Sequence, residues 1–269
     1  MNEPVPIPRV LVEALRGARA ITVLTGSGVS AESGVPTFRD AQTGLWARYD
    51  PADLATPEAF GRDPKLVWKW YEWRRKLVRE AAPNQGHFAL AELERRAPRF
   101  TLVTQNVDGL HRRAGSGDVI ELHGNITRSK CSVENAIVED YDPEGAPPVC
   151  PNCGAPLRPD VVWFGEALPA DALRAASDAA RACDLFFSVG TSGVVQPAAS
   201  LPFEALRGGA TVVEVNPDDT PLTRSADYAL RGKAGEVLPA LVAAVRDSCL
   251  KWRGFVDGGR GHGTVRFRR

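Results

Sequence analysis

The sequence predicts an α/β protein with a Rossmann-like open parallel sheet, helices on both faces, and a small domain built from two insertions. Three observations predict this fold. Short apolar segments alternate with Ala- and Leu-rich helical stretches, as in a parallel sheet covered by helices. Two long segments of different composition interrupt that alternation. The chain has 269 residues, 43% of them hydrophobic, which is enough to bury a full core.

Six short segments have the apolar composition of buried strands. The predicted strands are residues 21–25, 100–104, 119–122, 185–189, 211–215 and 228–230. Glycine or polar residues follow most of them directly. Because open parallel sheets bind ligands at the carboxyl ends of their strands, these following residues are the candidates for a site.

The two interrupting segments are expected to form the small domain. The first, 40–83, is rich in Trp and Arg and mostly helical in pattern; the second, 129–159, is rich in Pro, Gly and Cys. The predicted division is sheet domain 1–39, insertion 40–83, sheet domain 84–128, cysteine module 129–159, sheet domain 160–250 and tail 251–269. The tail is basic and turn-rich without apolar periodicity, so we expect it to be disordered.

Composition excludes several classes of protein. Lys+Arg and Asp+Glu balance at 33 each, so no overall charge recruits nucleic acid or an anionic membrane. No apolar run approaches the length of a membrane span, and residues 1–4 lack the features of a secretory signal. We therefore expect a cytoplasmic protein that binds neither nucleic acid nor membrane, with a monomer as the expected state.

The segment Gly26-Ser27-Gly28-Val29-Ser30-Ala31 follows the first predicted strand and indicates a glycine turn that opens a helix. Bare backbone N–H groups in such a turn attract a pyrophosphate. A dinucleotide dehydrogenase would show a second strand ending in an acidic residue within about 30 residues. Here the stretch 37–46 has a loop composition, and the next strand begins at Phe100. A dinucleotide site organised differently, without hydride transfer, is therefore indicated.

Seven segments in order resemble the sirtuins, NAD-dependent protein lysine deacylases, from about residue 10 to residue 245. They are residues 26–30, 34–39, 105–108, 123–124, 162–166, 190–192 and 216–218. The resemblance is strongest to bacterial members that remove acidic acyl groups. It implies that NAD and acyl-lysine meet between the two domains, and that the products are free lysine, nicotinamide and 2′-O-acyl-ADP-ribose.

The resemblance implies that His123, Asn106 and Asp108 are catalytic. In this chemistry the acyl oxygen attacks C1′ of NAD, nicotinamide leaves, and His123 activates a ribose hydroxyl. A neutral imidazole at a strand end, followed by Gly124, suits a general base near pH 7. Gln105, Asn106 and Asp108 would orient the nicotinamide ribose and amide. Taken alone, they favour a polar turn that caps the next helix, and only the other motifs reverse that preference.

The resemblance also assigns residues to NAD. They are Gly26, Ser27, Gly28, Ser30, Ala31, Thr37, Phe38, Arg39, Trp46, Gln105, Asn106, Val107, Asp108, Gly190, Thr191, Ser192, Asn216, Pro217, Asp218 and Ala234. Arg39 would meet a phosphate or the reacting acyl group, and Phe38 would shield the ribose. By spacing alone, this Phe-Arg pair favours packing and a surface charge.

Two further segments are assigned to the substrate. Val162, Trp163, Phe164, Gly165 and Glu166 would pair with the peptide backbone and line an acyl-lysine tunnel, or else form an ordinary buried strand.

Tyr71 and Arg74 lie three apart on the predicted helix 65–80, so a phenol and a guanidinium can converge on one anion. Their Tyr-x-x-Arg pattern resembles that of sirtuins acting on succinyl-, malonyl- or glutaryl-lysine. The alternative is an amphipathic helix with a snorkelling arginine.

The cysteine module predicts a structural zinc site held by Cys131, Cys150 and Cys153. Cys150 and Cys153 form a Cys-x-x-Cys knuckle, but Glu134 stands where a fourth thiolate is expected. Three Cys with Glu, three Cys with water, and a site without metal all stay open. The role of the metal would be folding, because coordination stabilises a module that lacks a core.

Two other functions stay open at this point. A mono-ADP-ribosyltransferase would share cleavage of the glycosidic bond but could dispense with His123. A non-catalytic NAD-sensing module would need no base at all, and the intact set of Gln105, Asn106, Asp108 and His123 argues against it.

Overall fold

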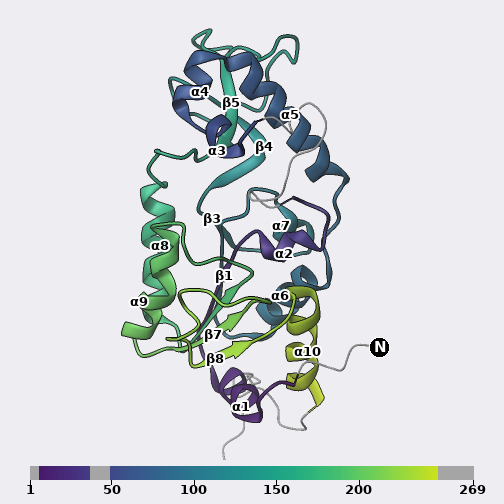
Figure 1. The fold of residues 1–269 in the computed structure, drawn as a ribbon, viewed down its shortest axis with the longest axis vertical. Helices are drawn as coiled ribbons and strands as arrows, with labels where there is room; N and C mark the ends of the chain where they lie inside the picture. The colour runs from purple at the N-terminus through teal and green to yellow at the C-terminus, as the bar shows by residue number, and fades with distance from the viewer. Residues whose placement is uncertain (1–5, 37–48, 248–269) are drawn as a thin grey trace, which may run out of the picture.

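A computed structural model describes residues 6–36 and 49–247 (Figure 1). Its main sheet has six parallel strands in the order β3-β2-β1-β6-β7-β8. The strands are β1 (Ile21–Thr25), β2 (Phe100–Thr104), β3 (Val119–Glu121), β6 (Leu185–Val189), β7 (Thr211–Val215) and β8 (Tyr228–Leu230). All six predicted strands are confirmed, although β3 ends one residue early. The predicted tail lies outside the described residues.

Helices cover both faces of this sheet, as predicted (Figure 1). One face packs against α1 (Arg9–Gly17), α6 (Gln85–Arg96) and α10 (Ala234–Asp247), and the other against α8 (Ala170–Ala182) and α9 (Leu201–Arg207). Alternate residues of β1 point to opposite cores: Val23 to the first and Leu24 to the second. The short α2 (Gly28–Ala31), α7 (Leu110–Arg113) and the 3₁₀ helix η2 (Ala198–Ser200) lie in the connections. In the described ranges, no helix is both long and apolar enough to cross a membrane.

The carboxyl ends of four strands lie level with one another. Thr25 of β1 is in register with Thr104 of β2 and with Val189 of β6, which is in register with Val215 of β7. The residues that follow these four strands therefore line one edge of the sheet. The strand order reverses between β1 and β6, and such a switch point is where open α/β sheets bind ligands.

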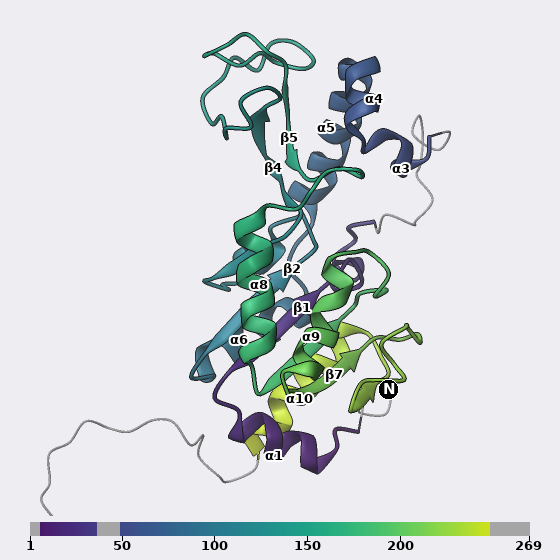
Figure 2. The same cartoon turned by 90° about the vertical axis from the view of Figure 1, so that its left-hand side faces the viewer.

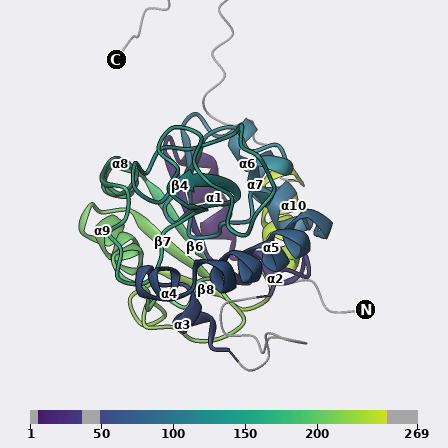
Figure 3. The same ribbon diagram turned by 90° about the horizontal axis from the view of Figure 1, so that it is seen from above.

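A smaller unit lies beyond this edge and combines segments from both insertions (Figures 2 and 3). It contains α3 (Pro51–Leu54), α4 (Pro57–Arg62), α5 (Pro64–Glu80) and the antiparallel strands β4 (Gly124–Cys131) and β5 (Leu157–Val161). Helix α5 begins where the Asp63 carboxylate accepts a hydrogen bond from the Leu66 N–H, with Pro64 at its first position. Trp68 of α5 packs with the cysteines of the second insertion. The domain boundaries given above stay a prediction.

Buried Arg75 joins helix α5 to strand β4. The register of β4 and β5 shifts between Asn125 and Ser129, so the intervening carbonyls of β4 do not pair with β5. Arg75 donates from Nε to the Ile126 carbonyl (2.6 Å) and from Nη2 to the Arg128 carbonyl (2.8 Å). Arg75 thereby supplies hydrogen-bond donors to two carbonyl oxygens of the shifted segment and holds α5 against the hairpin.

Candidate active site

A cavity of about 910 Å³ lies where the carboxyl edge of the sheet faces the smaller unit. It is lined by the loops after β1, β2, β6 and β7, and by side chains of α5 and the segment after β5. Every predicted catalytic, NAD and substrate residue in the described ranges lines this one cavity. The remaining four, Thr37, Phe38, Arg39 and Trp46, lie outside the described residues. The structure thus brings together residues up to 208 positions apart, from Gly26 to Ala234.

The glycine turn after β1 is packed against the loop after β6. The Gly26 N–H donates to the Val189 carbonyl (3.0 Å) and the Gly28 N–H to the Gly190 carbonyl (2.8 Å). A Cβ at either position would come within 3.0 Å of Gly190. The glycine turn predicts bare N–H groups here, and this prediction is wrong at Gly26 and Gly28, because both N–H groups are bonded within the protein. Glycine is required because two backbones approach closely beneath the cavity.

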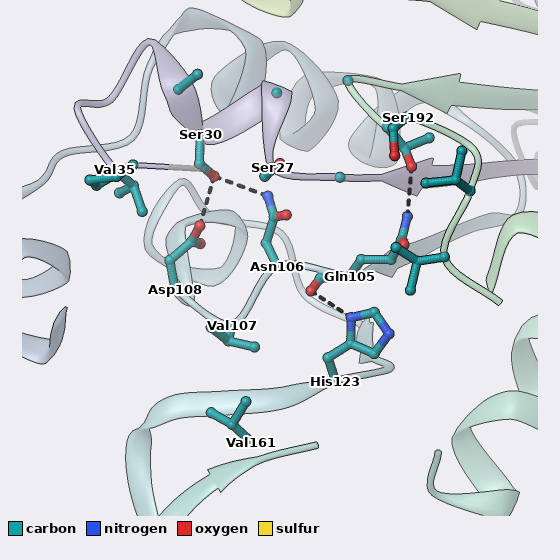
Figure 4. Close-up of a pocket in the computed structure, with 18 of the residues that line it drawn as sticks. Ser27, Ser30, Val35, Gln105, Asn106, Val107, Asp108, His123, Val161 and Ser192 are labelled. Carbon is teal, nitrogen blue, oxygen red and sulfur yellow. Dashed lines mark hydrogen bonds between the residues drawn. The ribbon is translucent and has the colours of Figure 1, made fainter. Parts of the chain in front are cut away.

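A buried polar network joins the loops after β1 and β2 (Figure 4). Ser30 Oγ donates to Asp108 Oδ2 (2.7 Å) and accepts from Asn106 Nδ2 (3.0 Å). Asp108 Oδ1 accepts from the Leu110 N–H (2.9 Å), which closes a polar turn just before α7; the N-cap of that helix is Gly109, and no side chain caps it. Burial raises the pKa of Asp108, although these hydrogen bonds lower it. A polar turn and a site are therefore not exclusive, because the Asp108 carboxylate closes the turn and also binds Ser30 in the network.

His123 is oriented by a single backbone hydrogen bond (Figure 4). Its Nδ1 lies 3.0 Å from the Gln105 carbonyl oxygen. A carbonyl only accepts, so Nδ1 must carry the proton and Nε2 presents its lone pair. Burial lowers the pKa of His123 from its ordinary value, with the Gln105 hydrogen bond acting in the opposite direction. The imidazole is thus neutral at pH 7 and can accept a proton at Nε2.

The turn that carries His123 is fixed by the β4–β5 hairpin. Gly124 has φ +80°, a conformation that favours glycine, and a Cβ there would clash with the Asp160 carbonyl oxygen. The Val162 N–H donates to the His123 carbonyl at 2.9 Å. The predicted substrate segment and the predicted base are therefore held by one another.

Ion pairs reinforce this turn from the opposite side. Arg128 bridges Glu121 (2.9 Å) and Asp160 (2.8 Å), and Glu121 also accepts from Asn125 Nδ2 (2.8 Å). Glu121 and Asn125 flank the turn that contains His123. Glu121, Asn125 and Arg128 are not predictable from the sequence, since nothing in the spacing of a charged strand distinguishes an ion-pair network from a solvated face.

Side chains cross-link the loops after β2, β6 and β7. Gln105 Nε2 donates to Thr191 Oγ1 (3.0 Å), and Asn216 Nδ2 donates to the Thr191 carbonyl (2.9 Å). Asn216 Oδ1 accepts from the Asp218 N–H at 3.3 Å. The polar residues after three strands thus hold one another in place at the cavity.

The wall formed by the smaller unit carries Tyr71 and Arg74. Tyr71 is only 2% exposed, and burial raises its pKa to about 12, so the phenol keeps its proton. Trp163 Nε1 donates to the Tyr71 hydroxyl at 2.9 Å. Arg74 as a residue is half-buried, and its guanidinium lies 5.1 Å from the centre of the Trp70 ring. A hydroxyl donor and a cation therefore line the same part of the cavity.

Arg158 and Glu166 support Trp163 from behind. Arg158 donates to both carboxylate oxygens of Glu166 (2.6 and 2.8 Å), and its guanidinium lies 3.3 Å from the centre of the Trp163 ring. The Glu166 carboxylate also accepts from the Trp163 N–H (2.8 Å). Arg158 is not predictable from the sequence, because it is the second residue of the short strand β5 and belongs to no motif.

Several other lining residues were not predicted. They are Glu32, Val35, Pro36, Ala55, Val78, Ile126, Val161, Leu168, Val194, Val195, Gln196, Val215, Asp219, Thr220, Pro221 and Lys233. Some of them directly follow a predicted motif in the same loop, so their place in the sequence indicates that they line the cavity. The apolar ones from the smaller unit carried no signal, because only tertiary packing brings them to the cavity.

The predicted metal ligands form a compact cluster away from the cavity. One donor atom from each of Cys131, Glu134, Cys150 and Cys153 lies within 4.8 Å of the others, and two of the sulfurs, of Cys131 and Cys153, are 3.4 Å apart. A tetrahedral zinc with Zn–S bonds of about 2.3 Å requires ligand atoms roughly 3.8 Å apart. The donor set and its size therefore fit zinc, with Glu134 in reach as the fourth ligand.

The chain is similar to known proteins over most of its length. The model of the Sir2 family matches residues 26–197. The chain is 55% identical over 247 residues to an NAD-dependent protein deacylase of Methylococcus capsulatus, covering 88% of this chain and 97% of that protein. It is 56% identical over 243 residues to NAD-dependent protein deacylase 1 of Pseudomonas aeruginosa, covering 87% and 97%.

Solved structures are also similar. A Sir2 homologue in complex with NAD has a TM-score of 0.84 and 49% identity, over 91% of this chain and 96% of that one. A mutant Sir2 homologue with 2′-O-acetyl ADP ribose has a TM-score of 0.83 and 51% identity, over 89% and 97%. A Sir2 structure with a deacetylated p53 peptide and 3′-O-acetyl ADP ribose has a TM-score of 0.78 and 33% identity, over 87% and 97%.

Proposed function

The chain belongs to the Sir2 family and is an NAD-dependent protein deacylase, and we propose that it prefers succinyl, malonyl and related acidic acyl groups on lysine. One observation carries the preference: Tyr71 and Arg74 line the same cavity as His123. A carboxylate at the far end of an acyl chain would meet a hydroxyl donor and a guanidinium there. An acetyl group would leave both without an anion.

We assign the chemistry of the reaction to the residues at the sheet edge. NAD and the acylated peptide are both substrates, and the named complexes of Sir2 relatives with NAD, acetyl ADP ribose and a peptide support this. The acyl oxygen forms a bond to C1′ of the nicotinamide ribose as the bond to nicotinamide breaks. His123 Nε2 then accepts the proton of a ribose hydroxyl, which attacks the acyl carbon. The lysine amine takes up a proton and leaves. A water molecule then attacks the acyl carbon and its bond to the oxygen on C1′ breaks, which gives 2′-O-acyl-ADP-ribose. Asn106 and Asp108 hold the ribose.

The donor chemistry of the cysteine cluster fits zinc. Cys131, Cys150, Cys153 and Glu134 would hold it, and zinc bound there would supply coordination free energy that stabilises the module. The cysteine cluster contributes no residue to the cavity lining. The proposed role is therefore folding and not chemistry.

The proposal also covers how the peptide binds, the oligomeric state and the compartment. The protein would bind its substrates as extended peptides along residues 162–166, the segment after β5 that lines the cavity. We propose that it acts as a monomer in the cytoplasm. Size-exclusion chromatography with light scattering would test the first point, and a larger species would contradict it.

The test compares acetyl-lysine and succinyl-lysine peptides of one sequence, with and without NAD, by mass spectrometry. We expect NAD-dependent removal of both groups, with the higher kcat/KM for succinyl. Arg74→Met should lower desuccinylation about 10- to 200-fold, because a charged hydrogen-bond pair is worth roughly 1.5–3 kcal/mol, and should lower deacetylation much less.

Arg79→Met is the matched control, since Arg79 is exposed on the same helix. Equal losses on both peptides with Arg74→Met would refute the acidic-acyl preference. A wild-type protein that removes acetyl faster would refute it as well. His123→Ala should abolish deacylation; retained transfer of ADP-ribose to a protein would favour the transferase alternative.

A further inference from the structure

The hydrogen bond between Trp163 and Tyr71 has a direction that the chemistry of the two groups decides. The indole Nε1–H is a donor only, whereas a phenol both donates and accepts. The 2.9 Å contact must therefore run from Trp163 to the Tyr71 oxygen. The proton of the Tyr71 hydroxyl is left to point elsewhere.

Among the described residues, that proton has no acceptor. Arg74, a cation of the cavity wall that acts electrostatically on Tyr71, offers only donors. Glu166 is the carboxylate that acts electrostatically on Tyr71. Both of its oxygens accept hydrogen bonds from Arg158, and one of them also accepts from the Trp163 N–H. Tyr71 itself is 2% exposed, so water reaches it only through the cavity. A buried donor of this kind favours a ligand that brings an acceptor.

We infer that Trp163 is a specificity-determining residue, which holds the Tyr71 hydroxyl as a hydrogen-bond donor toward the carboxylate of an acidic acyl group. This inference rests on the proposed acidic-acyl preference. Without the indole N–H, the phenol could rotate its proton away from the substrate. With it, only one arrangement satisfies both groups, so the donor is oriented before the substrate arrives.

The surroundings of Trp163 keep its indole in place. The Arg158 guanidinium covers one face of the ring at 3.3 Å, and Phe60 packs against it with ring centres 5.3 Å apart. Glu166 holds Arg158 and the Trp163 backbone together. Trp163 is 3% exposed. The support for the donor thus extends from the turn at Glu166 through Arg158 and Trp163 to Tyr71.

The experiment measures kcat/KM on matched succinyl- and acetyl-lysine peptides for wild type, Trp163→Phe, Tyr71→Phe and the double variant. Trp163→Phe removes the N–H and keeps an aromatic ring. We expect it to lower the succinyl-to-acetyl ratio about 2- to 10-fold, the factor of one ordinary hydrogen bond, mainly through KM for the succinyl peptide. The double variant should lose no more of the ratio than Tyr71→Phe alone.

Trp68→Phe is the matched control, because Trp68 is buried in the same unit but lies outside the cavity lining. It should leave the ratio at the wild-type value. A succinyl-to-acetyl ratio of Trp163→Phe equal to that of wild type would overturn the inference. Losses of the ratio that multiply in the double variant would overturn it as well. In either case, a low ratio in Arg74→Met would still support the proposed acidic-acyl preference. A wild-type ratio below one would overturn both.

Discussion

Gly124→Ala tests whether the turn that carries His123 is fixed by the hairpin behind it. Gly124 has φ +80°, and a Cβ there would come far inside the 3.0 Å limit that real Cβ atoms keep, against the Asp160 carbonyl oxygen. Relieving that clash requires the start of β4 to separate from the end of β5. The Val162 N–H bond to the His123 carbonyl spans this junction.

The cost has two parts. An alanine at positive φ costs about 1–2 kcal/mol. Loss of the Val162 hydrogen bond and of local packing adds about 1–2 kcal/mol. We therefore expect the free energy of unfolding to fall by about 2–4 kcal/mol. Because the turn moves, we also expect deacylation kcat to fall at least about 10-fold, which is the rate effect of 1.4 kcal/mol.

Gly209→Ala separates the cost of alanine at positive φ from the cost of the lost hydrogen bond and packing. Gly209 has φ +84°, and a Cβ there would meet nothing within 4 Å. It lies in the turn between α9 and β7, outside the cavity lining. Denaturant unfolding and kcat are measured for both variants. If Gly124→Ala is no less stable than Gly209→Ala and retains wild-type kcat, the hairpin does not position His123 and our reasoning is wrong.

Three further predictions follow from the structure. Burial lowers the pKa of His123 from its ordinary value of about 6.5, so the imidazole stays neutral to a lower pH than a free histidine. The acidic limb of the kcat/KM–pH profile should therefore have its midpoint below pH 6.5. A midpoint above pH 7 would contradict this. If Glu134 is the fourth zinc ligand, Glu134→Ala should bind zinc more weakly in a chelator competition than wild type, and Glu134→Cys more tightly; equal affinity of Glu134→Ala and wild type would exclude Glu134. Arg75→Met should lower the free energy of unfolding by about 2–4 kcal/mol, because the buried Ile126 carbonyl and the part-buried Arg128 carbonyl lose a charged donor. Exposed Arg79→Met should change it by less than about 0.5 kcal/mol, and similar values for the two would refute the role given to Arg75.

The fold was predictable because its signals are local. A parallel strand such as Leu185–Val189 is buried on both faces, so its composition alone identifies it. Strand β4 was missed because its residues Gly124 to Cys131 are mostly polar and take their partners from α5 and β5. Hydrogen bonding to a distant arginine leaves no pattern in the strand itself.

The candidate site divides in the same way. Residues directly after a strand, such as Gln105 and Asn216, were predictable because the carboxyl ends of parallel strands share one edge. The purpose of Gly26 and Gly28 was not, since close approach to Gly190 exists only once β1 and β6 lie side by side.

The sequence by itself determined the strands, the polar residues at their ends, the cysteine cluster and the Tyr71–Arg74 pair. Only the tertiary structure decided how these groups act. The tautomer of His123 follows from the Gln105 carbonyl, and the direction of the Tyr71 hydroxyl follows from Trp163, 92 positions away. The physical reason is that a hydrogen bond depends on distance and orientation in space, and neither is encoded in the spacing of residues along the chain.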